Sequence, residues 1–286
     1  MSGAATDDPT APIEGEDSGI SQIHGILLSA LGEIDRILSS TGCRYFLAYG
    51  TALGARRHSG LIPWDVDADL HLHSQDRLAA LEALQAGLSD SPFAVEAPGD
   101  PGYEYLFPRV VLRGVHHTLI RVDLFPLDPA PQSARARSLL TRMLRLTSKA
   151  HMLKAMDLAE RRHYGRAKYT VARAAKLLLL PVPLAMIAAA HRGLITAAGR
   201  FGSGDTLVNT SGSYGAREYF PATWFTSGST LSLSGHAFPA PTPPDEYLAQ
   251  VYGDFMSPPS PEQVEAEVAF AREHYVAPLR RAGVLS

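Results

Sequence analysis

The segment GTALGARRHSGLIPWDVDADLHLH, residues 50–73, contains the alternating pattern and the paired acids that best predict the fold and the chemistry of this chain. From residue 67 to residue 73 polar and apolar residues alternate, and this period of two predicts a β-strand. Asp67 and Asp69 then point to one face of the strand, where adjacent carboxylates repel each other. A divalent cation, Mg²⁺ or Mn²⁺, is the simplest group that would hold them together, since oxygen ligands suit both ions. The alternative is a pair of solvated acids on an exposed edge.

Residues on both sides of these acids extend the candidate site. Gly50 and Thr51 follow residues 45–49, which predict a short strand, and a tight turn there would present backbone N–H groups to a phosphate. His71 and His73 continue the face of the two acids beyond the pair. They are either solvent-facing or supporting side chains, or further metal ligands.

A second alternating segment supplies a third acid. In residues 121–125, Arg121 and Asp123 share one face, and apolar residues occupy the other. If this strand lies beside the first one in a sheet, Asp123 becomes a third carboxylate at the same metal.

The wider pattern predicts an α+β fold in which a mixed sheet is flanked by helices. Apolar residues at helical spacing predict an amphipathic helix over residues 20–40, and Ser74 is a candidate N-cap for a leucine-rich helix. Further strands are predicted near residues 93–96, 103–107, 109–113 and 118–125.

Composition narrows the class of protein. The 286 residues include 26 Lys and Arg and 29 Asp and Glu, and this net charge of −3 argues against a dedicated nucleic-acid binder. The hydrophobic share of 45% excludes collagen and a chain that is disordered throughout. A single cysteine, Cys43, excludes an internal disulfide and favours a reducing compartment. The acidic residues 1–18 predict a disordered tail rather than a signal peptide.

Positive charge is concentrated in one segment. Residues 135–176 contain 12 basic residues and two acids, and much of the segment has helical spacing. One interpretation is a solvated basic helix. The other is attraction to phosphates on a nucleotide, an acidic glycan or a membrane surface.

The motifs together resemble one family. Residues 50–69 are similar to the LicD/fukutin signature, Gly-Thr-x-Leu-Gly-x-x-Arg-His-x-Gly-x-Ile-Pro-Trp-Asp-Asp-Asp-x-Asp. Residues 121–127, 214–225 and 235–256 resemble its later blocks. Two departures stand out: Val66 replaces the middle acid of the first block, and Ser234 replaces an acid often found before the glycine of the fourth. Val66 should point away from the acidic pair, whereas Ser234 leaves the acceptor chemistry open.

The resemblance implies a reaction. It predicts a nucleotidyltransferase-like, LicD-type phosphotransferase that moves a phosphoryl-linked alcohol, such as phosphocholine or ribitol phosphate, from a CDP-linked donor to a hydroxyl. The acceptor would be a glycan, a glycolipid or a small glycosylated molecule, and no nucleic acid is expected. The alternative is a nucleotidyltransferase that transfers NMP from an NTP to a small hydroxyl acceptor and releases pyrophosphate. A third hypothesis is a non-catalytic member that binds an anionic glycan or partner.

Roles follow for individual residues. Asp67, Asp69 and Asp123 are expected to bind Mg²⁺ or Mn²⁺ and to carry catalysis. The donor-binding set is expected to comprise Gly50, Thr51, Arg57, His58, Trp64 and Asp65. Two alternatives stay open: Arg57 could instead form an ion pair with Asp65, and Trp64 could be a packing residue beside the site.

We expect four parts along the chain: a disordered tail (1–18), a nucleotidyltransferase-like core (19–130), a basic helical segment (131–200) and a loop-rich C-terminal motif region (201–286). We expect a cytoplasmic protein, with peripheral contact at the inner face of the membrane as an alternative. The oligomeric state is open.

Overall fold

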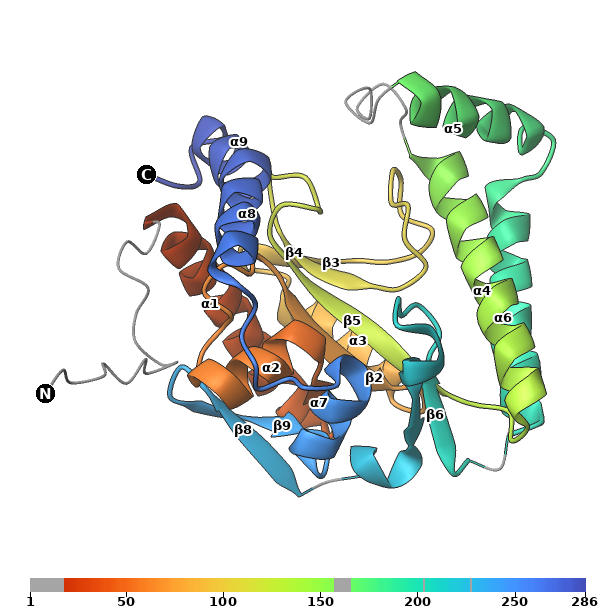
Figure 1. The fold of residues 1–286 in the computed structure, drawn as a ribbon, viewed down its shortest axis with the longest axis horizontal. Helices are drawn as coiled ribbons and strands as arrows, with labels where there is room; N and C mark the ends of the chain where they lie inside the picture. Colours follow the sequence, from red (N-terminus) through yellow and green to blue (C-terminus); the bar gives the residue numbers. More distant parts are fainter. Residues whose placement is uncertain (1–17, 157–165, 203, 227) are drawn as a thin grey trace, which may run out of the picture. The chain divides into compact units, whose positions relative to one another are not determined.

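The computed structural model describes residues 18–156, 166–202, 204–226 and 228–286 (Figure 1). The chain divides into two compact units that interleave along the sequence. Unit 1 comprises residues 1–95, 110–124 and 224–286, and unit 2 comprises residues 96–109 and 125–223. The expected tail lies outside the described residues up to residue 17, and Ser18 begins the first helix.

Unit 1 contains the sheet that carries the acids. Its strands are β1 (Tyr45–Leu47), β2 (Ala68–His73), the first half of β5 (Arg121–Pro129), β4 (Arg109–Leu112) and β3 (Phe93–Glu96), paired in that order. Strands β1 and β2 are antiparallel, with Tyr45 opposite Leu72. The apolar face of β2 is fully buried at Ala68 and Leu70, as its alternation predicts.

Helices complete the core of unit 1. α1 (Ser18–Thr41) buries one stripe of apolar residues and packs against α3 (Arg77–Gly87). α2 (Tyr49–His58) follows β1 after one residue. The C-terminal part consists of the β8 (Ser229–Leu233) and β9 (His236–Ala240) hairpin, α7 (Pro244–Tyr252), α8 (Pro261–Ala271), the π-helical turn η4 (Arg272–Val276) and α9 (Ala277–Arg281).

Unit 2 is a smaller sheet with three long helices. The second half of β5 pairs with β6 (Thr206–Asn209), which pairs with β7 (Tyr219–Pro221), and both pairings are antiparallel. The helices are α4 (Ala134–Ala155), α5 (Arg166–Leu178) and α6 (Leu184–Arg200), and α4 and α6 lie side by side (Figure 1). The 3₁₀ turn η2 (Gly215–Glu218) precedes β7, and η3 (Ala222–Phe225) follows it.

The α+β fold with a mixed sheet flanked by helices is confirmed. So are the helix over residues 20–40 and the strands near residues 93–96, 109–113 and 118–125. The four-part division stays a prediction. Among the described residues, no helix is both long and apolar enough to cross a bilayer.

Two local predictions are wrong. Residues 103–107 form no strand: the Tyr103 hydroxyl donates to the carbonyl oxygen of Phe107 (2.7 Å), which closes a loop. The N-cap position of α3 is Asp76, not Ser74. The Asp76 carboxylate accepts hydrogen bonds from the Arg44 backbone and side chain, which fixes the turn before the helix.

Candidate functional site

The three predicted acids lie on neighbouring strands of unit 1. Asp67 directly precedes β2, Asp69 lies on β2, and Asp123 lies on β5, which pairs with β2. Asp65 lies near them, since the charge of Asp67 acts on its carboxyl group. The strand order therefore brings together acids that are more than fifty residues apart in the sequence.

Arg121 is the positive charge within this acidic cluster. Its guanidinium contacts the Asp67 carboxylate, and its Nε lies 3.8 Å from Oδ1 of Asp123. Nη1 donates to the carbonyl oxygen of Thr118 (2.7 Å), and the guanidinium carbon lies 5.8 Å from the ring centre of Tyr275. Burial alone would lower the pKa of Arg121, but the two carboxylates raise it above its usual value. Arg121 thus bridges two of the predicted metal ligands.

Burial and mutual repulsion make the cluster costly to ionise. Removal from water raises the pKa of Asp65 well above its usual value, and the Asp67 charge raises it further. The pKa of Asp69 is raised in the same way, first by burial and then by Asp67, Asp123 and Asp65. The cluster therefore holds more carboxyl groups than one guanidinium can balance, and ionising all of them would require a further positive charge.

The carboxyl groups of this cluster are suitable ligands for a divalent cation, although their side chains do not have the geometry of an assembled metal site. All the acids offer oxygen ligands, which Mg²⁺ and Mn²⁺ prefer. Within the described ranges, no three His, Cys, Asp or Glu side chains have the spacing of an assembled metal site. The guanidinium of Arg121 instead contacts Asp67 and Asp123, so a bound ion would have to compete with it.

The start of α2 lies against the acids. Gly50 and Thr51 belong to the first turn of this helix rather than to the expected tight turn, and Tyr49 begins it with a φ of 41°. Oγ1 of buried Thr51 accepts a hydrogen bond from the backbone N–H of Asp69 (2.8 Å). A Cβ on Gly50 would lie 2.7 Å from Oδ2 of Asp65, so a glycine is needed at this close approach.

The remaining donor-binding candidates lie at the other end of α2 and just before the acids. Arg57 Nη1 donates to the carbonyl oxygen of Phe255 (3.1 Å), in place of the ion pair with Asp65 that was one alternative. Burial, and then the charge of Arg57, lowers the pKa of His58. The buried Nε2 of His58 has no hydrogen-bond partner among the described residues. Trp64 is half-buried.

Tyr247 on α7 is a supporting residue to which the sequence motifs alone assign no role. Its hydroxyl accepts a hydrogen bond from the Tyr49 backbone N–H (3.1 Å) and lies 3.0 Å from Nε2 of His71. His71 is therefore fully buried, packed edge-on against the rings of Tyr49 and Phe225, and does not face solvent. His73 instead lies 3.2 Å from an Arg44 nitrogen. The fourth motif block thus supports the strand that carries Asp69.

The structure shows the surroundings of Val66 and Ser234, the two residues that depart from the family pattern. Val66 is buried, as an apolar residue between two acids should be. Ser234 and Gly235 form the two-residue turn of the β8–β9 hairpin, and both have positive φ, as in a type I′ turn. The Ser234 N–H donates to the carbonyl oxygen of Ser59 (2.7 Å), so this turn contacts the end of α2.

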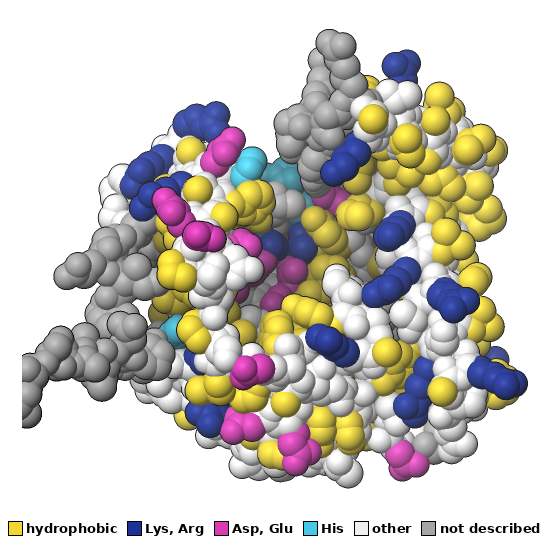
Figure 2. Space-filling view, viewed as in Figure 1, with side chains coloured by type: hydrophobic (Ala, Val, Ile, Leu, Met, Phe, Trp, Pro, Cys, Tyr) yellow, Lys and Arg dark blue, Asp and Glu magenta, His cyan; other side chains and the backbone are white. Residues whose placement is uncertain are grey.

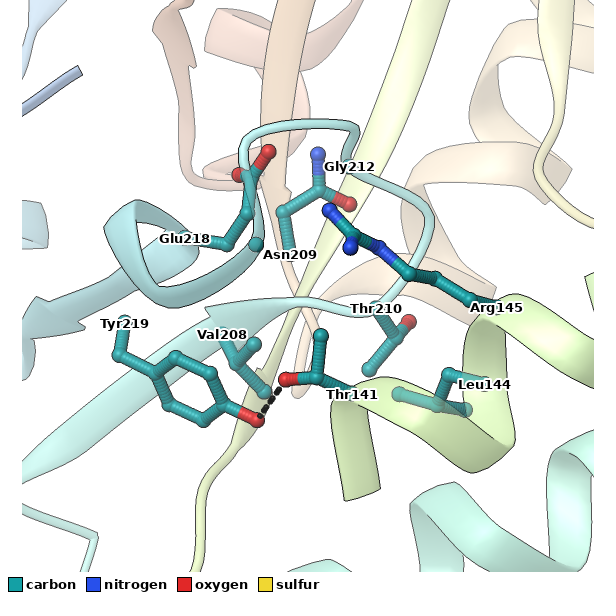
Figure 3. A pocket seen from close by; sticks show the side chains of 10 residues that line it. Thr141, Leu144, Arg145, Val208, Asn209, Thr210, Gly212, Glu218 and Tyr219 are labelled. Atoms are coloured by element: carbon teal, nitrogen blue, oxygen red, sulfur yellow. Dashed lines mark hydrogen bonds between the residues drawn. The ribbon is translucent and has the colours of Figure 1, made fainter. Parts of the chain in front are cut away.

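The third motif block forms a separate polar pocket in unit 2, between α4 and the β6–β7 connection (Figure 3). Glu218 is buried and accepts a hydrogen bond from the Tyr214 backbone N–H (2.8 Å), and a Cβ on Gly212 would collide with it. Arg145 donates to the carbonyl oxygen of Ser213 (3.0 Å). These contacts hold the connection in place, which is a structural role.

Comparisons with known proteins agree with the motifs. Residues 42–153 match the family model described as LicD/FKTN/FKRP, nucleotidyltransferase domain. The ribitol 5-phosphate transferase FKRP of Homo sapiens and that of Mus musculus are each 36% identical over 109 residues, covering 36% of this chain and 21% of the relative. The match therefore spans about a fifth of the length of these relatives.

A solved structure, the antibiotic-resistance factor ANT(2″)-Ia, is 13% identical and covers 61% of this chain and 95% of its own, but its TM-score of 0.25 is too low to compare folds. The family match contains the acidic residues and the start of α2. Residues 42–153 of this chain are therefore similar to the nucleotidyltransferase domain of the LicD/fukutin family.

Proposed function

We propose that this protein is a metal-dependent transferase that moves a phosphoryl-linked alcohol from a CDP-linked donor to a hydroxyl group of a glycan, a glycolipid or a small glycosylated acceptor. The observation that carries the proposal is the acidic cluster of Asp67, Asp69 and Asp123, which lies inside the domain shared with ribitol 5-phosphate transferases.

The acids would hold Mg²⁺ or Mn²⁺. Such an ion, when bound, neutralises charge that develops on the diphosphate during transfer. The excess of carboxyl groups over Arg121 supports this role, because burial and mutual repulsion oppose their ionisation and a bound cation would favour it. A carboxylate of the cluster that does not bind the ion would accept the proton of the attacking hydroxyl.

The donor would be held by groups on and near α2. The first turn of this helix, at Gly50 and Thr51, provides the positive end of a helix dipole beside the acids. The buried Nε2 of His58 is a polar atom that a donor oxygen could satisfy. Arg57 and Trp64 are proposed contacts at the same end of the site, on the evidence of the family motif alone.

A panel of donors tests the reaction. The protein is incubated with Mg²⁺, a small glycosylated acceptor and one donor at a time: CDP-ribitol, CDP-choline, CDP-glycerol, CTP or ATP. The proposal predicts release of CMP from at least one CDP-alcohol, and loss of activity in EDTA. Asp67→Asn and Asp69→Asn should each reduce the rate by at least about a hundredfold, whereas Asp90→Asn, at an exposed position on another segment, should not.

The leaving group separates the two enzyme classes. Release of pyrophosphate from an NTP, with no CMP from any CDP-alcohol, would overturn the proposal in favour of a nucleotidyltransferase, a class that the description of the matched domain also names. Turnover that survives the double variant Asp67→Asn/Asp69→Asn would overturn both.

A further inference from the structure

The three long helices of unit 2 carry positive charge and no acidic residue. α4 has six Lys and Arg, α5 has four, and α6 has two, while none of the three contains Asp or Glu. Lys154 and Lys176 donate to backbone carbonyls at Leu179 and Met156 and so serve the fold. The exposed basic side chains are Arg135, Arg142, Arg145, Lys149, Lys168, Arg173, Arg192 and Arg200.

Large apolar side chains are exposed on the same helices and just beyond their ends. Of the thirteen exposed large hydrophobic residues in the described parts of the chain, nine lie between Leu139 and Phe201. They are Leu139, Met143, Leu146, Val171, Leu177, Leu178, Leu180, Met186 and Phe201. Leu178 and Phe201 are 79% and 77% exposed, which a folded protein in water does not favour without a partner. We call these basic and apolar side chains together the α4–α6 surface.

The two kinds of side chain are interleaved rather than separate. One face of α4 carries both kinds, since each of the following residues lies three or four positions from another of the set: Leu139, Arg142, Met143, Leu146 and Lys149. This face differs from the buried one that packs with α6. Figure 2 shows dark-blue basic side chains among yellow apolar ones over α4, α5 and α6.

We infer that the α4–α6 surface binds an anionic lipid bilayer. Each Lys or Arg near such a membrane gains attraction to lipid phosphates, and exposed Leu, Met and Phe side chains gain by entering the boundary between headgroups and acyl chains. The combination fits this partner better than others. A nucleic acid would match the charge but would leave the apolar side chains in water. A second copy of the same surface would place basic residues against basic residues.

The inference does not depend on the proposed function, because it rests on unit 2 alone. It is tested by sedimenting the full chain with vesicles of phosphatidylcholine, with or without about a quarter of phosphatidylglycerol. We expect binding to the anionic vesicles that weakens with added salt. The variant Arg142→Gln/Lys149→Gln should reduce the partition coefficient by about thirtyfold, from about 1 kcal/mol per basic residue. The matched control, Arg36→Gln/Arg281→Gln, removes the same charge elsewhere and should have little effect.

The apolar contribution is tested separately. Leu139→Gln/Leu146→Gln should reduce vesicle binding at least tenfold, even at high salt, since it removes two side chains that would leave water. Leu78→Gln, at an exposed leucine of α3, is the control and should bind normally. All these positions are exposed, so the variants should fold, and transfer to a water-soluble acceptor should be unchanged.

Three outcomes would overturn the inference. The first is equal partitioning into neutral and anionic vesicles, or into neither. The second is tight binding of duplex DNA or RNA that the α4–α6 surface variants abolish, without vesicle binding. The third is a dimer in analytical ultracentrifugation that Leu139→Gln/Leu146→Gln dissociates, again without vesicle binding.

Discussion

Replacing Arg121 by glutamine should destabilise the protein and make its stability depend on Mg²⁺. The guanidinium contacts Asp67 and lies 3.8 Å from Asp123, and the three side chains are 13%, 22% and 8% exposed. Removing one partner of a buried ion pair lowers the free energy of unfolding by roughly 3–5 kcal/mol. Because Asp67 is partly exposed, we expect a loss of about 3 kcal/mol here. A cation that neutralises the released carboxylates would offset the loss, and at a hundred times its Kd it would contribute about 2.7 kcal/mol.

The measurement is the free energy of unfolding in urea, first in EDTA and then in Mg²⁺, for the parent and the variant. Arg56→Gln is the matched control. Arg56 pairs with Asp245 (Nε to Oδ1, 2.7 Å), but the two side chains are 40% and 55% exposed, so the loss should be under about 1 kcal/mol. This role of Arg121 is contradicted if Arg121→Gln costs no more than Arg56→Gln, or if Mg²⁺ stabilises the variant no more than the parent.

Three further predictions concern the scaffold. Gly54→Ala should cost about 1–3 kcal/mol in urea unfolding, because its Cβ would lie 2.6 Å from a backbone oxygen, whereas Gly25→Ala, with nothing within 4 Å, should not destabilise; equal effects would contradict the packing. Thr51→Val should cost about 1–3 kcal/mol and lower the transfer rate by leaving the Asp69 N–H without its acceptor, and Thr51→Ser should restore both. Burial lowers the pKa of His191 to about 4, so stability present at neutral pH is lost as pH falls from about 6.5 toward 4. Between pH 7 and pH 5 this one residue should account for a loss of about 2 kcal/mol, so the loss in His191→Gln should be smaller by that amount, and parallel curves would refute it.

The local periodicity of the sequence was enough to predict the sheet and the first helix. The alternation from residue 67 to residue 73 places Ala68 and Leu70 in the core, and the structure buries both completely. The same alternation was misleading at residues 103–107. There Tyr103, Tyr105 and Phe107 form a loop in which the Arg109 guanidinium stacks on the ring of Tyr105 at 3.6 Å. Aromatic residues at alternate positions are compatible with a strand, but they do not show whether another strand is available to pair with it.

The acidic residues of the site could be predicted from the sequence, but most of the residues that hold them in place could not. Asp67, Asp69 and Asp123 could be identified because their spacing places carboxylates on one face of each strand. Arg121 is two residues before Asp123, and this spacing was the one available signal for its place in the cluster. Tyr247 lies within residues 235–256, which resemble a family block, but its role could not be predicted, because its contacts with Tyr49 and His71 join segments far apart in the sequence.

We propose that these acids hold one divalent cation. Mn²⁺ binding followed by electron paramagnetic resonance, with the full chain and CDP present, tests it most directly. We predict one Mn²⁺ per chain, displaced by excess Mg²⁺, and its loss in Asp67→Asn/Asp69→Asn but not in Asp90→Asn. A chain that binds no Mn²⁺ even with CDP, or a double variant that binds it as the parent does, would contradict the account.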